Sequence, residues 1–406
     1  MSKNTKSSNR WLILTASVFA MLFAGIIYAW SILKVPFAQD FGWNAEQLSL
    51  NFTLTMCSFC LGGLLGSFLA RKIGVKLTGL ISAVLAGIGM VTTGFLNSDS
   101  VVLLYLTYAV MAGLGIGIAY NVIIATVSAH FPDKKGLCTG CLMMGFGASS
   151  LILGNLADLS FKSEFGLKGT YILLGIALFA VLGLVSLFLR RPIENEVLPV
   201  VVKKKNGFAE DFEQKDYTTK QMLKRFSFWR AFALLAFATA VGNSVISFAR
   251  DLAVSVGAKV TLATTLVGVL AVFNGFGRII TGALFDWLGR KKTMLIATVL
   301  TIVAAGITLL SVITGSVVLC IIGLCLTGLS YGSCPTMVTS FVSSFYGQKH
   351  FATNFSIMNC NLICASFIAT VCSNLLKTFG GYTAPFILLL TLAVVALILN
   401  LSIKRP

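Results

Sequence analysis

Charged residues are scarce in this chain: only 11% of its 406 residues are Asp, Glu, Lys or Arg, and only 14 are acidic. A soluble globular domain carries roughly 25% charged residues, so this composition argues against a water-soluble protein. Hydrophobic residues make up 57% of the sequence and the mean hydropathy is +0.90. Because each membrane-spanning helix needs about 20 consecutive apolar residues, the composition predicts an all-α protein that crosses a bilayer many times.

The sequence also lacks the motifs of several function classes. No Gly-x-x-x-x-Gly-Lys-Ser/Thr phosphate loop occurs, which argues against ATP-driven pumping by this chain. Its two histidines lie beside polar segments and form no nucleophile–base pattern, so we expect neither an enzyme nor a cofactor. Two Cys-x-x-Cys pairs, at 57–60 and 138–141, lie in or open apolar runs without a nearby His. We therefore expect reduced packing thiols rather than a metal site.

Apolar runs separated by short polar segments predict twelve membrane-spanning helices. No small-residue cleavage site follows the first run, so we expect it to be retained rather than removed as a signal peptide. The predicted helices cover residues 11–33, 48–70, 77–96, 101–128, 137–158, 169–190, 229–249, 262–287, 293–313, 316–344, 350–375 and 382–403.

One long polar stretch divides these helices into two groups of six. It predicts two six-helix bundles, 1–190 and 229–406, joined by a cytoplasmic linker at 191–228. The end of that linker, 217–225, mixes Met222 and Leu223 with three basic residues, which predicts a short amphipathic helix on the inner leaflet.

The Lys and Arg residues fix the expected orientation. The net charge of +17 is concentrated in short segments between apolar runs, which is a topology signal rather than a nucleic-acid-binding surface. With both termini in the cytoplasm, most basic residues lie inside, as the positive-inside rule requires. We therefore predict a multi-pass inner-membrane protein that binds no nucleic acid. The few basic residues left outside are Lys34, Lys162, Lys168, Arg250, Lys259 and Lys377.

The two halves repeat one another at an offset of roughly 211–215 residues. A parallel repeat of two six-helix bundles is typical of transporters that bind substrate near the membrane midplane, between the halves. The matched segments are Gly117–Tyr120 with Gly328–Tyr331, Phe131–Lys135 with Phe345–Lys349, and Arg71–Lys76 with Asp286–Lys291.

The segment Gly282-x-x-x-Asp286-x-x-Gly289-Arg290-Lys291 resembles the cytoplasmic-loop motif of the major facilitator superfamily. The resemblance implies that this loop and its copy at Gly74 latch the inward face. The copy carries Arg71 where the motif has Asp, so a weaker latch is expected there. Further segments are similar to the oxalate/formate antiporter family and its relatives, the monocarboxylate transporters. These are Tyr28–Ser31, Phe41–Asn44, Phe131–Gly136 and Asn274–Arg278, and the similarity runs over the whole chain.

Arg278 is the strongest candidate for a functional residue. It lies about ten residues, or roughly 15 Å, from the cytoplasmic end of its predicted helix. A charge at that depth costs at least about 2.5–3.5 kcal/mol, and Arg cannot lose its proton. An ion pair between helices would explain it, but no Asp or Glu lies at comparable depth. We therefore favour binding of an organic anion, since a carboxylate matches the planar guanidinium.

Asn274 lies one helical turn before Arg278 and can donate to a bound carboxylate or hold the guanidinium. Tyr120 and Tyr331 occupy matching places in the aligned repeats, and Tyr28 ends the first predicted helix. The family resemblance implies that all three tyrosines face the central cavity, where phenols can bind a carboxylate.

Helix eleven bears on the choice of anion. The resemblance implies a second cation, a Lys, midway along this helix in oxalate carriers. Here the stretch reads Asn359-Cys360-Asn361-Leu362 and carries no charge, which leaves Cys360 and Asn361 as candidate site residues. One fixed cation neutralises a monoanion but not a dianion.

We therefore predict a monomeric carrier of a small monocarboxylate such as lactate, pyruvate, acetate or formate, with protons as the expected coupling ion. Two alternatives stay open: an anion exchanger of the oxalate/formate type, and a membrane anion sensor that signals through 192–228.

Overall fold

The computed structural model describes residues 10–99, 101–190, 192 and 215–404, so most of the predicted linker at 191–228 lies outside the described residues. The chain forms two compact units. One contains Met1–Cys138 and Gly145–Val202, and the other contains Thr139–Met144 and Lys203–Pro406. The short stretch Thr139–Met144 belongs to helix α8, so this helix contributes residues to both units.

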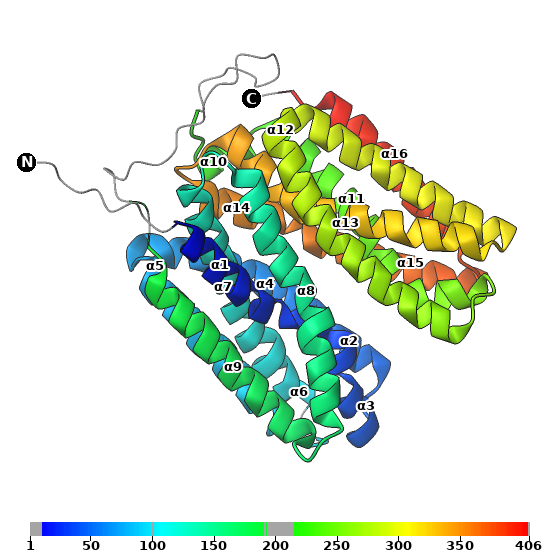
Figure 1. The fold of residues 1–406 in the computed structure, drawn as a ribbon, viewed down its shortest axis with the longest axis horizontal. Coiled ribbons are helices and arrows are strands. Elements are labelled where there is room, and N and C mark those ends of the chain that lie inside the picture. Colours follow the sequence, from blue (N-terminus) through cyan, green and yellow to red (C-terminus); the bar gives the residue numbers. More distant parts are fainter. Residues whose placement is uncertain (1–9, 100, 191, 193–214, 405–406) are drawn as a thin grey trace, which may run out of the picture. The chain divides into compact units, whose positions relative to one another are not determined.

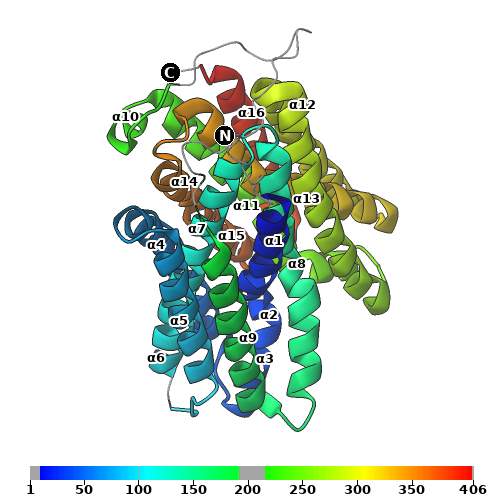
Figure 2. The same ribbon diagram turned by 60° about the vertical axis from the view of Figure 1, so that its left-hand side comes forward.

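The described secondary structure is entirely helical (Figures 1 and 2). The first unit is built from α1 (Arg10–Ala24), η1 (Gly25–Ala29), α2 (Trp30–Leu33), α3 (Val35–Asp40), α4 (Ala45–Lys72), α5 (Val75–Thr93), α6 (Val101–Leu104), η2 (Tyr105–Ala112), α7 (Gly113–His130), α8 (Lys135–Phe161) and α9 (Gly166–Phe188). The second contains α10 (Thr219–Leu223), α11 (Phe226–Ser255), α12 (Val260–Thr314), α13 (Val317–Tyr346), α14 (Phe351–Asn359), α15 (Asn361–Phe379) and α16 (Thr383–Ser402).

Eleven helical stretches in the described part of the chain are long and apolar enough to cross a membrane. One of them, α12, has 55 residues and therefore measures about 80 Å, far more than the roughly 30 Å of a bilayer core. It breaks at Gly289, where φ is 74° and ψ is 178°. The two parts of α12 correspond to the predicted helices 262–287 and 293–313, which accounts for the twelve crossings expected from the sequence.

Four described spans contain irregular backbone that the apolar pattern does not predict. The first span passes from α1 through a 3₁₀ segment, η1, before it continues as α2 and α3. The fourth passes from α6 through a π-helical segment, η2, into α7, and the seventh, α11, is kinked at Phe248. The eleventh divides at Cys360 into α14 and α15. Such irregularities within spans often accompany functional sites.

The internal repeat is visible in the backbone of the two units. Gly74 joins α4 to α5 with φ of 84° and ψ of 163°, and Gly289 has nearly the same conformation. This region of backbone space is open essentially to glycine alone. The match between segments 71–76 and 286–291 is therefore confirmed at the level of backbone geometry.

The helix contacts correct one part of the sequence alignment. A Cβ on Gly117 would lie 2.0 Å from the carbonyl oxygen of Phe59, and one on Gly332 would lie 2.1 Å from that of Asn274. Gly113 and Gly328 form the same kind of contact one turn earlier, with Thr55 and Leu270. These pairs share the spacing of Gly74 and Gly289, so Gly117 corresponds to Gly332 rather than to Gly328.

The predicted equivalence of Tyr120 and Tyr331 is consequently wrong. In the register set by the glycine contacts, the two tyrosines lie one helical turn apart in the repeat. The Gly-x-x-Tyr pattern occurs in both halves, but a helix can present such a pattern in any register, and only the packing fixes it.

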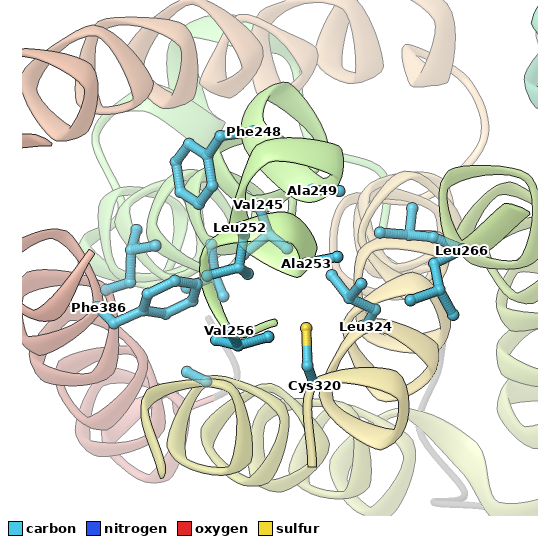
Figure 3. Packing of buried hydrophobic residues seen from close by; sticks show 14 of the residues in the cluster. Val245, Phe248, Ala249, Leu252, Ala253, Val256, Leu266, Cys320, Leu324 and Phe386 are labelled. Atoms are coloured by element: carbon cyan, nitrogen blue, oxygen red, sulfur yellow. The ribbon is translucent and has the colours of Figure 1, made fainter. Parts of the chain in front are cut away.

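The core of the second unit is centred on α11 (Figure 3). Val245 and Leu252 of α11, with Val256 directly after it, lie in one cluster with Phe386 of α16 and Cys320 of α13. Lipid tails are as apolar as these side chains, so close van der Waals packing, rather than exclusion of water, stabilises the arrangement. This packing holds α12 and α13, which run side by side, in a fixed register.

The beginning of each bundle binds a polar loop of its own unit. In the first unit, Arg10 forms a bidentate ion pair with Asp133, with N–O distances of 2.6 and 3.2 Å. In the second, the Asp216 carboxylate accepts hydrogen bonds from the backbone N–H groups of Gln348 at 2.9 Å and Lys349 at 3.1 Å. Both contacts fasten an entering segment to the loop between the fourth and fifth spans of its unit.

Candidate functional site

Arg278 is buried in the second unit, with 2% of its surface exposed. Its Nε donates a hydrogen bond to Oδ1 of Asn274 at 3.2 Å, and its Nη1 donates to the backbone carbonyl of Met143 in α8. The third guanidinium nitrogen, Nη2, forms no hydrogen bond with any described residue. The cation is therefore held by two oxygen dipoles, with one nitrogen left to donate.

No carboxylate of the described residues lies within 4.0 Å of the Arg278 guanidinium. Asp158 lies in α8 and pairs instead with Lys162, at 2.5 Å. An intramembrane ion pair, the alternative considered from the sequence, is thus absent from the described part of the structure. A buried cation without an anionic partner is costly, which favours a role in binding an external anion.

Glycines fix the helical turn that carries Arg278. A Cβ on Gly140 of α8 would lie 2.6 Å from the Arg278 carbonyl oxygen. On the α13 side, a Cβ on Gly332 would lie 3.1 Å from the Arg278 backbone nitrogen. Thr336, also in α13, donates from Oγ1 to the Arg278 carbonyl at 3.2 Å. Close approach of helix backbones at small residues is a common basis of packing in membranes.

Of the two roles predicted for Asn274, the structure shows the contact with the Arg278 guanidinium. Its Oδ1 accepts from Nε of Arg278, as the i, i+4 spacing in one helix predicts. The amide Nδ2 is the remaining donor of this half-buried side chain and forms no hydrogen bond with the described residues. Asn274 therefore orients the guanidinium and keeps an N–H₂ group available beside it.

Tyr28 and Tyr120 lie together in the first unit. The ring of Tyr28 packs edge-on against Phe146, with 5.2 Å between centroids, and that of Tyr120 packs against the same phenylalanine at 5.0 Å. Tyr120 also contacts Phe59, at 4.9 Å. The structure thus brings these two predicted site residues into one aromatic cluster.

Tyr331 packs in the second unit against Gly242 of α11. A Cβ at Gly242 would lie 2.4 Å from the Tyr331 side chain, so the glycine makes room for the ring. Only 7% of Tyr331 is exposed. This contact gives Tyr331 a packing role.

Cys360 and Asn361 lie where the eleventh span breaks. Cys360 separates α14 from α15, and Asn361 is the first residue of α15. The Nδ2 of Asn361 donates to the Met358 carbonyl at 2.6 Å, while its buried Oδ1 has no partner among the described residues. Half-helix ends at such breaks face substrate in several transporter folds.

The predicted gating residues lie at the two glycine loops. Arg71 is in the last turn of α4, directly before the Gly74 loop. Asp286, Arg290 and Lys291 flank Gly289, and the Arg290 guanidinium lies 4.4 Å from the centroid of the Phe345 ring in α13. This contact connects two of the segments that the sequence repeat singled out.

Two participants were missed from the sequence: the Met143 carbonyl and Gly140. A backbone carbonyl carries no signal of its own in a sequence. Gly140, however, belongs to Gly136-x-x-x-Gly140, a small-residue spacing that marks helix contacts in membranes.

Comparisons with known proteins agree with this architecture. The family model of the Major Facilitator Superfamily matches residues 12–370. The chain is 26% identical over 360 residues to an uncharacterized MFS-type transporter of Escherichia coli K12, YhjX, which covers 88% of this chain and 86% of that protein. It is 27% identical over 292 residues to the oxalate:formate antiporter of Oxalobacter formigenes, covering 70% of this chain and 66% of the antiporter.

A shorter match joins the chain to human monocarboxylate transporter 12. It is 32% identical over 139 residues, and covers 34% of this chain and 26% of that protein. Among solved structures, the E. coli fucose:proton symporter FucP superposes with a TM-score of 0.69 at 15% identity, over 98% of this chain and 100% of that one. The proton:xylose symporter XylE reaches 0.74 at 13% identity, covering 98% and 97%. At these identities the likeness shows the fold. The chain therefore belongs to the Major Facilitator Superfamily and is a multi-pass membrane transporter with homology to the oxalate:formate antiporter and the monocarboxylate transporters.

Proposed function

We propose that this transporter carries small monocarboxylates, such as lactate, pyruvate, acetate or formate, and that Arg278 is the cation that binds them. The observation that supports this most strongly is the state of Arg278: it is buried and has no carboxylate partner among the described residues. A substrate anion supplies the missing charge. The printed names of two homologues, an oxalate:formate antiporter and a monocarboxylate transporter, agree with that class of substrate.

The available donors suit one carboxylate. Asn274 orients the guanidinium through Nε, so that Nη2 and the Asn274 Nδ2 group remain available as donors near a bound carboxylate. Hydrogen bonds to a charged group are about twice as strong as neutral ones, so this pair gives both affinity and orientation. Tyr28, Tyr120 and Tyr331 are proposed to provide phenol groups and an apolar wall for the substrate's short tail.

Charge balance favours a monoanion. A monocarboxylate neutralises Arg278, whereas a dicarboxylate would leave one negative charge buried without a partner. The break at Cys360 and Asn361, where a second cation would be needed, offers only neutral groups.

We further propose proton-linked transport by a monomer in the cell inner membrane, with both termini in the cytoplasm. The loops at Gly74 and Gly289, with Arg71, Asp286, Arg290 and Lys291, are proposed as the cytoplasmic gate. Alternating access between the two bundles, 1–190 and 229–406, is the expected mode of transport for such a repeat.

The second candidate is exchange of oxalate for formate. The 27% identity to the oxalate:formate antiporter favours it. An exchanger would cross the membrane only when loaded, because an empty Arg278 is too costly to carry across alone.

Uptake into proteoliposomes tests both candidates. Labelled lactate, acetate, formate and oxalate are compared with and without an inward proton gradient, for wild type, Arg278→Gln and Arg278→Lys. We expect gradient-stimulated monocarboxylate uptake that falls roughly a hundredfold in Arg278→Gln, since loss of one partner of a buried charge pair costs 2–5 kcal/mol. Arg278→Lys keeps the charge but loses the planar fork, so partial uptake is expected.

Arg250→Gln is the matched control, because it removes the same chemical group from an exposed position at the end of α11. It should retain wild-type uptake, and the thermal stability of each variant shows whether it is folded. Oxalate uptake that ignores the gradient but rises with internal formate would overturn the monocarboxylate proposal and establish exchange.

A further inference from the structure

The guanidinium of Arg278 has two edges that can bind a carboxylate with two hydrogen bonds. One edge presents Nε and Nη2, and the other presents Nη1 and Nη2. Asn274 occupies Nε of the first edge, and the Met143 carbonyl occupies Nη1 of the second. A carboxylate bound along either edge must therefore replace one of these two oxygens.

The two replacements differ in whether the displaced oxygen still has another hydrogen-bond partner. Met143 lies inside the continuous helix α8, where its carbonyl oxygen keeps its place in the helical hydrogen-bond ladder. Oδ1 of Asn274 has Nε of Arg278 as its one partner among the described residues. Since leaving a partly buried acceptor unpaired is costly, the Met143 bond is the easier one to give up.

We propose that a substrate carboxylate takes the place of the Met143 carbonyl on Arg278 and thereby releases the Thr139–Met144 stretch of α8 from α12. The inference rests on the proposed function, because it requires a carboxylate on Arg278. It adds a consequence of binding: occupation of the site removes a polar tie between two helices.

The contacts that remain after release are packing contacts. Gly140 lies against the backbone of Arg278 and Ile279, and the Met144 side chain lies near Gly275. Dispersion contacts of this kind are individually weak and tolerate sliding better than an oriented hydrogen bond does. Release therefore leaves the Thr139–Met144 stretch held to α12 by packing contacts alone.

A native cysteine reports on this movement. Cys141 is half-buried and lies directly after Gly140, within the stretch that should be released. Cys57 in α4 is also half-buried and belongs to the first unit, so it serves as the matched reference. Maleimide alkylation followed by peptide mass spectrometry measures the rate at each cysteine separately in the full-length chain.

Three proteins are compared in proteoliposomes, with lactate, pyruvate, acetate and formate each used as the probe. In the wild type, a probe should raise the Cys141 rate several-fold and leave the Cys57 rate unchanged. In Arg278→Gln the hydrogen bond to the Met143 carbonyl is already lost, so Cys141 should react fast, and the probe should not change its rate. In Gly140→Ala the added Cβ would lie 2.6 Å from the Arg278 carbonyl oxygen, which pushes α8 away. Its Cys141 should also react fast without a probe, although the Arg278 side chain is unchanged.

Binding is measured in parallel by the shift in thermal stability that each probe causes. If a probe binds to the wild type and the Cys141 rate does not change, the release proposal is wrong and the proposed function stands. If no probe binds or is taken up, the proposed function fails, and the release proposal fails with it. A Cys141 response in the wild type that persists in Arg278→Gln would also overturn the proposal.

Discussion

Arg278 lies within a membrane-spanning part of α12, and its described surroundings supply oxygen dipoles in place of a counter-ion. Part of this arrangement follows from the sequence. Asn274 is one turn away in the same helix, so its contact with Arg278 is a local property that spacing predicts. The Met143 carbonyl is 135 positions away in the chain, and its contact depends on how α8 packs against α12. Tertiary packing of this kind leaves no local signature in a single sequence.

A second charged contact, between Arg10 and Asp133, predicts how the stability of the fold depends on pH. Partial burial opposes ionisation of Asp133, but hydrogen bonds from Arg10 and the backbone and the nearby positive charges outweigh it, so the pKa of Asp133 is lowered from its ordinary 3.8. Because the folded state then binds the proton more weakly than the unfolded state, the pair stabilises the fold above that value and loses its effect as the pH falls through the folded pKa.

The melting temperature of purified wild type and Asp133→Asn, measured from pH 6 down to pH 3, checks this. The wild type should be the more stable protein at pH 6, and the difference should shrink below about pH 4. Asp158→Asn is the control, since its exposed pair with Lys162 should contribute little. A difference between wild type and Asp133→Asn that stays constant over the whole range would contradict the assignment.

At the scale of helices, the sequence predicts where spans occur better than how regular they are. Long apolar runs predict all twelve crossings, because length and hydropathy suffice for that. The 3₁₀ segment η1, the π segment η2 and the break at Cys360 leave no comparable trace. They depend on partners elsewhere in the fold that satisfy the displaced backbone groups.

The glycine loops give a prediction at this scale. Gly74→Ala and Gly289→Ala should each destabilise the protein by about 1–3 kcal/mol, because both positions use backbone angles that residues with a Cβ avoid. Crowding is not the cause at Gly74, where an added Cβ would meet nothing within 4 Å. Thermal unfolding in detergent measures the effect.

Gly268→Ala provides the matched control. Gly268 also has open space around it, but it lies in the helical part of α12 with ordinary backbone angles. There alanine should be neutral or stabilising by about 0.5–1 kcal/mol. Equal losses at Gly268 and Gly74 would show that backbone conformation is not the reason.

For the molecule as a whole, the sequence predicts that a repeat exists and misplaces part of it. The loops at Gly74 and Gly289 are correctly paired, because a cytoplasmic loop has a distinctive mixture of Gly and charge. The fourth and tenth spans are misaligned by one turn, because glycine-rich apolar helices look alike in neighbouring registers. The correct register follows from the backbone contacts of Gly117 and Gly332.

The repeat predicts that equivalent Gly→Ala substitutions in the two units lower the stability of the protein by similar amounts. Gly117→Ala and Gly332→Ala each place a Cβ at 2.0–2.1 Å from a backbone oxygen, so each should lower stability by about 1–3 kcal/mol or more. Gly183→Ala and Gly306→Ala are controls, one in each unit, with no atom closer than 3.9 Å. Thermal unfolding of the four variants tests the register. A clear loss at Gly117 with none at Gly332 would contradict it.

The break of α12 at Gly289 has a mechanical meaning. A flexible loop between two helices absorbs displacement, whereas one glycine between continuous helical segments leaves almost no slack. A shift of the Arg278 segment along its axis is therefore passed on nearly undiminished to the following segment. There Thr298 accepts a hydrogen bond from Asn400, at 3.1 Å, which connects the motion to α16. The single residue Gly289 and this hydrogen bond therefore link the helix that carries Arg278 to the last helix of the chain.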